Sequence, residues 1–119
     1  MNRKCPIYQV ANFLGKRWTL LIICELNKGK KKWKRYSEIK KKLPEMTPKM
    51  LSARFKELER EGLIRKHVDA STFPIKSEYR LTEKGEDFIG VVQDMKQWAL
   101  KWQVRNEHCE NVNCEECDL

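Results

Sequence analysis

The stretch LPEMTPKMLSARFKELEREGLI, residues 43–64, decides the fold. Thr47 can cap a helix within it, and Pro48 suits the first position of that helix, where a missing N–H costs nothing. Gly62 then ends the helix before an apolar pair that begins a strand. The stretch therefore predicts a short helix, a tight turn and a second helix.

The second helix of this stretch has two different faces. At about 100° per residue, Leu51, Phe55 and Leu58 form one apolar stripe. The opposite face is basic and small, as a DNA major groove requires of a helix that follows a helix and a turn. An ordinary amphipathic surface helix is the alternative, and Arg54 and Glu57 are better explained by pairing with each other than by reading bases. The residues expected to contact DNA here are Thr47, Pro48, Lys49, Ser52, Ala53 and Lys56, with Arg60 on the same face.

Positive charge is concentrated just before this stretch. The 119 residues carry a formal net charge of +8, and segment 28–42 alone holds nine basic residues and one acid. A solvated charged face is the simpler interpretation, but the position beside a candidate helix-turn-helix favours contact with DNA phosphates. The basic residues expected to contact phosphate are Lys31, Lys32, Lys34 and Arg35.

Three further helices are expected in the first part of the chain. Apolar residues at helical spacing predict a first helix over 7–14, and the apolar segment 18–26 predicts a buried central helix. Cys24 in the central helix is most simply a small core hydrophobe. Ser37 can cap a third helix over 38–43.

Two strands are expected after the stretch. Residues 63–69 and 78–82 read as strands joined by the loop 70–77. Two strands alone are marginal, so they must pack on the helices as a β-wing. Lys76 in the loop is a candidate for contact with phosphate or the minor groove, with a solvated lysine as the alternative.

A long helix is predicted from Thr82 to about Glu107. Large apolar residues repeat along it at intervals of three and four. A helix of this length extends beyond a small core and its tryptophans need cover, so a dimer interface explains the stripe better than packing on its own domain. The stripe consists of Phe88, Val91, Met95, Trp98 and Trp102.

The chain divides into a DNA-binding and dimerisation domain, residues 1–107, and a Cys-rich acidic tail, residues 108–119. The tail cysteines Cys109, Cys114 and Cys117 have C-x4-C-x2-C spacing. A structural zinc would need a fourth ligand, such as His108, Cys5 or a residue of a second protomer. Zinc, an iron–sulfur cluster, redox pairing and an inert tail all stay open.

The amino terminus has no long apolar core of a secretion signal, and the longest apolar run, 20–24, is too short to cross a bilayer. We therefore expect a cytoplasmic protein without a membrane partner, in which cysteines are reduced, metal-bound or redox-active. Cys5 is a redox candidate because Arg3 and Lys4 favour its thiolate. Its alternative role is packing at a dimer seam.

An ordered series of motifs spans residues 5–102. The motifs are Cys5-Pro6, GKRWTLLI (15–22), YSEI (36–39), KMLS (49–52), LEREGLI (58–64) and EYRLTEKG (78–85). Together they resemble the HxlR-type winged helix-turn-helix transcriptional regulators. Two features depart from the family pattern, namely the strongly basic run 28–35 and the tail from residue 107 onward.

The resemblance implies a mainly α fold with a small β-wing and a homodimer in which the first and last helices pair, which adds Ile7 and Val10 to the expected interface. Two recognition helices would enter successive major grooves. Some relatives use the cysteine of their Cys-Pro motif to sense electrophiles or oxidants, which implies that role for Cys5.

The expected function is a homodimeric, sequence-specific regulator of transcription that binds double-stranded DNA and responds to thiol chemistry or a metal. The alternative is a winged-helix interaction module in a larger transcription or replication assembly. An enzyme is not expected, because neither His67 nor His108 has a nucleophile and a base arranged around it. The operator, the sign of regulation and the signal are not set by the sequence.

Overall fold

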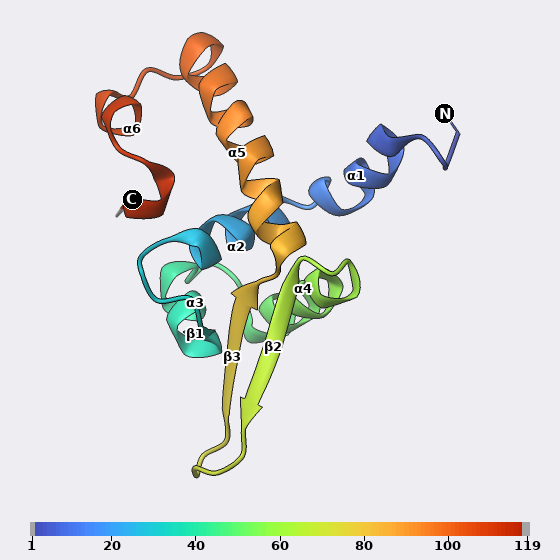
Figure 1. The fold of residues 1–119 in the computed structure, drawn as a ribbon, viewed down its shortest axis with the longest axis vertical. Coiled ribbons are helices and arrows are strands. Elements are labelled where there is room, and N and C mark those ends of the chain that lie inside the picture. The colour runs from blue at the N-terminus through green and yellow to red at the C-terminus, as the bar shows by residue number, and fades with distance from the viewer. Residues whose placement is uncertain (1, 118–119) are drawn as a thin grey trace.

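The computed structural model of the protein describes residues 2–117. Its elements, in chain order, are α1 (Pro6–Leu14), α2 (Arg17–Asn27), β1 (Lys34–Arg35), α3 (Tyr36–Lys42), α4 (Pro48–Arg60), β2 (Ile64–Asp69), β3 (Lys76–Leu81), α5 (Glu83–Trp102), α6 (Glu107–Asn111) and the short 3-10 helix η1 (Cys114–Glu116). The β2–β3 hairpin projects from one side of a helical body, and α5 leaves it on the other (Figure 1). The predicted class, mainly α with a small β-wing, is confirmed.

The core lies between α2, α3, α4 and the hairpin. Leu51, Phe55 and Leu58 are buried in it, which confirms the apolar stripe predicted for α4. The Phe55 ring stacks on the Tyr79 ring of β3, with ring centroids 4.1 Å apart. This stacking fixes the orientation of α4 relative to the wing.

The turn before α4 differs in one respect from the prediction. Helix α3 ends at Lys42, so the quoted stretch opens with the turn and contains one helix. Leu43 and Met46 are buried and anchor the turn. Thr47 caps α4 as predicted, its Oγ1 accepting a hydrogen bond from the Met50 amide at 3.2 Å.

Helix α3 begins earlier than predicted. Its first residue is Tyr36, so Ser37 lies inside the helix and Arg35 holds the N-cap position. The Glu38 carboxylate accepts a hydrogen bond from the Arg35 amide at 3.4 Å. An acid at the third helical position makes this contact, and the helix therefore begins two residues earlier in the sequence than predicted.

The sheet has three strands where two were predicted. All pairs are antiparallel and the order is β1-β3-β2. In the β1 register, Lys34 lies opposite Tyr79 and Arg35 opposite Glu78. Strand β3 begins at Lys76, which therefore belongs to a strand and not to the loop.

Helix α5 starts as predicted and ends early. Thr82 Oγ1 accepts a hydrogen bond from the Gly85 amide at 3.2 Å, but the helix stops at Trp102 instead of continuing to about Glu107. The Val104 amide donates back to the Ala99 carbonyl at 2.9 Å, which closes the last turn. Within residues 2–117, no helix combines the length and apolar character needed to cross a membrane.

The tail folds back on the body (Figure 1). The Gly29 amide donates to the Glu115 carbonyl at 2.7 Å, and Lys96 Nζ donates to the Val112 carbonyl at 2.9 Å. Helix η1 packs against α2. The last two residues of the predicted tail, 118–119, lie outside the described residues.

Candidate nucleic-acid interface

The outer face of α4 is held in a fixed rotation. Lys16 Nζ and Arg54 Nη1 contact Glu57 Oε1 at 2.8 Å and 2.6 Å, so Arg54 and Glu57 pair as predicted. The hydrogen bond from Lys16, followed by that from Arg54, lowers the pKa of the Glu57 carboxyl. With the core stripe buried and this network on one flank, the remaining side of the helix is presented to solvent. The residues exposed there are Thr47, Pro48, Lys49, Ser52, Ala53, Lys56 and Arg60.

A hollow of about 620 Å³ lies between α4 and the wing. Ser52 lines it from α4, Arg35 from β1 and Lys76 from β3, so the fold brings together three residues that the sequence assigned to DNA contact separately. Tyr36 and Ser37 at the start of α3 line it too, and the sequence reasoning missed them as contact residues. Both belong to the YSEI motif, which was the available signal. Lys66 of β2 lines the same hollow.

The tip of the wing is apolar and exposed. Phe73 is 99% exposed and Ile75 is 62% exposed, although large apolar side chains at a solvated loop cost free energy without cover. At the other end of the loop, the amide and hydroxyl of Ser71 donate to Asp69 Oδ1. The hydroxyl and then the amide lower the pKa of the Asp69 carboxyl.

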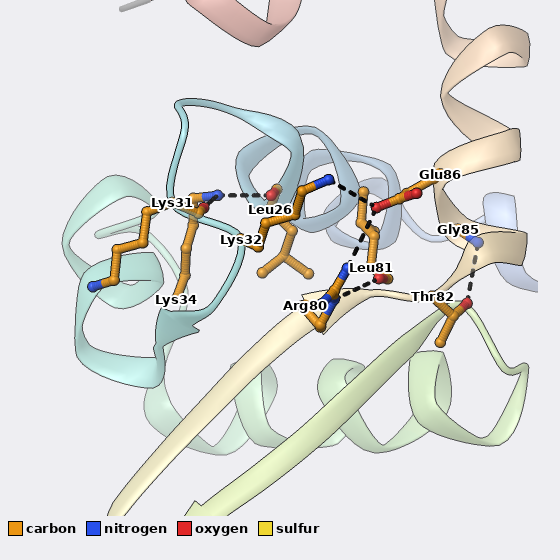
Figure 2. Close-up of polar contacts among 9 residues, drawn as sticks. All are labelled: Leu26, Lys31, Lys32, Lys34, Arg80, Leu81, Thr82, Gly85 and Glu86. Atoms are coloured by element: carbon orange, nitrogen blue, oxygen red, sulfur yellow. Dashed lines mark hydrogen bonds and ion pairs between the residues drawn. The ribbon is translucent and has the colours of Figure 1, made fainter.

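Two lysines of the basic run lie in exposed ion pairs, and Figure 2 shows the pair of Lys32 with Glu86. Lys31 Nζ is 2.6 Å from Glu38 Oε1, and Lys32 Nζ is 3.4 Å from Glu86 Oε1. Arg80 Nη2 approaches the same Glu86 oxygen at 3.7 Å. Exposed pairs contribute only about 0–1 kcal/mol each, so a phosphate can compete for these lysines.

Lys34, in contrast, does not lie in an exposed ion pair with any residue that the structure describes. It is half-buried, and its Nζ donates to the Leu26 carbonyl at 2.7 Å and to the Lys31 carbonyl at 3.0 Å (Figure 2). Burial lowers the pKa of Lys34. The ammonium therefore links the loop after α2 to the end of that helix, and contact of Lys34 with phosphate stays a prediction.

An apolar face along α1 and α5 has no cover from residues 2–117. Ile7, Trp98 and Trp102 are 69%, 58% and 66% exposed, and Val91 is exposed as well. Val10, Phe88 and Met95, the other residues of the expected interface, are half-buried. A hollow of about 340 Å³ between the two helices is lined by Val10, Phe13, Phe88 and Val91, among others.

The five cysteines are thiols without disulfides, and each is half-buried. Cys5 occupies the N-cap position of α1. Cys24 was predicted to lie in the core, but it is only half-buried. Its helix, α2, packs against η1. Within residues 2–117, no three potential ligands gather at a single metal site. In the tail, Cys117 Sγ is 4.0 Å from His108 Nε2. Zinc at Cys109, Cys114 and Cys117 stays a prediction.

Comparison with known sequences identifies a matching family and several relatives. The sequence model described as HxlR-like helix-turn-helix matches residues 13–107. The HTH-type transcriptional regulator YvaP of Bacillus subtilis strain 168 is 38% identical over 102 residues, which cover 85% of this chain and 91% of YvaP. The HTH-type transcriptional regulator YodB of the same strain is 40% identical over 118 residues, covering 97% of this chain and 96% of YodB.

Solved structures share the fold. A structure described as a MarR-family transcriptional regulator from Porphyromonas gingivalis W83 superposes with a TM-score of 0.75 at 29% identity, covering 86% of this chain and 96% of that one. The reduced form of YodB superposes with a TM-score of 0.72 at 38% identity, covering 87% and 98% of the two chains. YodB has also been crystallised after diamide treatment and with bound quinone.

Proposed function

We propose that this chain, which belongs to the HxlR-like helix-turn-helix family of transcriptional regulators, binds specific duplex DNA as a homodimer and responds to electrophiles or oxidants through Cys5. The observation that carries the proposal is the exposed basic face of α4, which adjoins the hollow shared with the wing. A helix face with short and basic side chains reaches base edges in a major groove. The apolar face along α1 and α5 supports pairing with a second copy.

Two groups of residues have separate tasks in this proposal. Lys49 and Ser52 on α4 read bases, whereas Lys30, Lys31 and Lys32 contact phosphates. The lysines stand on the loop after α2, near Arg80 and Leu81 at the end of β3. The ion partners of Lys31 and Lys32 are exposed, so phosphate can compete with them. Phosphate contacts supply affinity without sequence information, and base contacts supply discrimination.

The test begins with selection of duplex DNA fragments by the purified protein, followed by binding measurements at several salt concentrations. Changing Lys30, Lys31 and Lys32 to Gln should weaken binding to all sequences and flatten the salt slope by about one unit per lost phosphate contact. Lys49→Ala or Ser52→Ala should reduce discrimination at individual base pairs by about 1–3 kcal/mol.

Arg105→Gln is the matched control, because Arg105 is an exposed cation beyond the far end of α5. It should leave both the slope and the discrimination unchanged. Equal loss of discrimination in both groups of variants would contradict the division of tasks. Displacement by nonspecific DNA as readily as by selected DNA would instead favour an interaction module over a regulator.

The response to oxidants rests on Cys5 and on YodB. Cys5 precedes Pro6 at the start of α1, next to the apolar face where a second copy would pack. YodB, 40% identical to this chain, has been crystallised with quinone and after diamide treatment. Modification of Cys5 at that seam would alter the spacing of the two recognition helices without touching the DNA face.

The response is tested by titrating reduced, quinone-treated and chelator-treated protein against selected DNA, together with metal analysis. Quinone should change the affinity of the wild-type protein and leave the Cys5→Ser variant unchanged. A change on chelation, with metal present in the untreated protein, would assign the response to zinc at the tail. Equal affinities in all states would refute a thiol or metal response.

A further inference from the structure

The carboxyl-terminal tail is packed against α2 in a defined way. Asn106 and Asn113 side chains accept hydrogen bonds from the Cys109 and Glu115 amides at 3.1 Å and 3.0 Å and so begin α6 and η1. The Gly29 amide, just beyond the end of α2, donates to the Glu115 carbonyl at 2.7 Å. These contacts set Cys114, the first residue of η1, beside the last turns of α2.

Cys24 lies in the last turns of α2, the helix against which η1 packs. Both Cys24 and Cys114 are half-buried thiols, so reagents can reach them while the packed elements hold them in place. Burial raises the pKa of Cys24, and the neighbouring Cys114 thiolate raises it further. Cys24 on α2 and Cys114 on η1 belong to two elements that pack against each other. Residues 24 and 114 are far apart in the sequence, so only the folded tail brings them together.

We propose that Cys24 and Cys114 form a dithiol site that a hydroperoxide oxidises to an intramolecular disulfide. The site is separate from Cys5 and lies within one chain. It also replaces the expectation that Cys24 is an inert core residue. Three observations carry it: the hydrogen bond from Gly29 to Glu115, the packing of η1 on α2, and the partial exposure of both thiols.

The chemistry balances with the hydroperoxide as the oxidant. The Cys114 thiolate attacks the terminal oxygen of the hydroperoxide, so an S–O bond forms, the O–O bond breaks, and the alkoxide takes a proton and leaves as an alcohol. Cys24 then gives its proton to water, and its sulfur attacks the Cys114 sulfur, from which hydroxide leaves and becomes water. Two thiols and one hydroperoxide yield one disulfide, one alcohol and one water. Cys114 reacts first because the raised pKa of Cys24 keeps that residue protonated.

The disulfide would fix the tail at the base of the basic run. Gly29 directly precedes Lys30, so the tail bonds to the residue from which the phosphate-contacting lysines extend. This consequence rests on the proposed DNA binding, whereas the disulfide itself does not. In a Cys5→Ser background, hydroperoxide should change DNA affinity about fivefold, which corresponds to the net contribution of about one backbone hydrogen bond.

The experiment oxidises the full chain with cumene hydroperoxide, alkylates the remaining thiols and identifies linked tryptic peptides by mass spectrometry. Cleavage after Arg17, Lys28 and Arg105 leaves Cys24 in peptide 18–28 and all three tail cysteines in peptide 106–119. The link between these peptides should form in wild-type protein and in the Cys5→Ser, Cys109→Ser and Cys117→Ser variants. It should disappear in Cys114→Ser and Cys24→Ser.

A mixture of unlabelled and 15N-labelled protein separates links within a chain from links between chains. Linked peptides of uniform label support the proposal, and peptides of mixed label overturn it. The proposal is also overturned if the link persists in Cys114→Ser, or if Cys24 remains open to alkylation at excess hydroperoxide. Because mass spectrometry detects the disulfide directly, this test is independent of DNA binding and of the Cys5 response.

Discussion

Glu57 is the residue through which α4 is tied to the start of α2. Its carboxylate accepts hydrogen bonds from Lys16 and Arg54, and both lower its pKa in the folded state. A carboxyl whose folded pKa is depressed stabilises the fold above its unfolded pKa and loses that contribution as pH falls through the folded pKa. We therefore expect Glu57→Gln to reduce the free energy of unfolding by about 1 kcal/mol at pH 7.

Urea unfolding at pH 7 and at about pH 3 provides the measurement. The difference between wild type and Glu57→Gln should shrink as the pH falls below the unfolded-state pKa of glutamate, because the stability that the charged carboxylate contributes is then progressively lost. Glu45→Gln is the control, since Glu45 pairs with Arg17 at 3.6 Å and both side chains are exposed. A Glu57 difference that stays constant across this range would show that the ion pairs do not stabilise the fold.

Single residues also show where sequence reasoning reaches its limit. The burial of Leu51, Phe55 and Leu58 was predictable, because helical spacing alone sets which side chains share a face. The inward position of Lys34 was not, because a lysine in a basic run has no local signal for the carbonyls that it will meet. Cys24 was misjudged for a related reason. A helix rich in apolar residues predicts burial, but the tail residue that reaches it lies 90 positions away.

At the scale of elements, the start of α5 depends on one glycine. A Cβ atom on Gly85 would overlap the Leu63 carbonyl oxygen and crowd a methyl group of Leu81, so the helix passes closely over the end of α4 and the start of β2. We expect Gly85→Ala to destabilise the protein by about 2 kcal/mol, as overpacking does in a core. Thermal or urea unfolding of the variant measures this.

Gly90 on the same helix supplies the comparison. Nothing lies within 4 Å of a Cβ atom built there, so Gly90→Ala should gain helix propensity and stabilise the protein by about 0.5–1 kcal/mol. Opposite signs for the two substitutions would support the close approach at Gly85. Equal and small effects would mean that α5 can shift away from Leu63 without cost.

The elements differ in how far local sequence determines them. Helices α4 and α5 begin where Thr47 and Thr82 cap them, and such caps are readable because the residue and its amide partner are neighbours in the chain. Strand β1 was missed because two residues carry no period, and they become a strand only by pairing with β3. The early end of α5 was missed too, since Gln103 to Asn106 contains neither Gly nor Pro to mark it.

At the scale of the whole molecule, the apolar face of α1 and α5 should govern assembly. Trp98→Glu places a charge in the middle of that face, so it should yield monomers in sedimentation experiments. Operator affinity should fall by about a hundredfold or more, because a single half-site loses the benefit of two linked contacts. Phe73→Ser is the control for assembly, since this large apolar residue is also exposed but lies at the wing tip. An unaltered dimer in Trp98→Glu would place the interface elsewhere.

The third strand, β1, connects the wing to the helical body at a second place. Without β1, the hairpin would hinge freely at Ile64 and Leu81, and a force at its tip would bend it without moving the body. Arg35 of β1 lies opposite Glu78 in the sheet, and the Phe55 ring stacks on Tyr79. A movement of the wing tip is therefore transmitted to β1 and to α4. In the proposed complex with DNA, a contact at the wing tip would therefore act on α4 as well as on the wing itself.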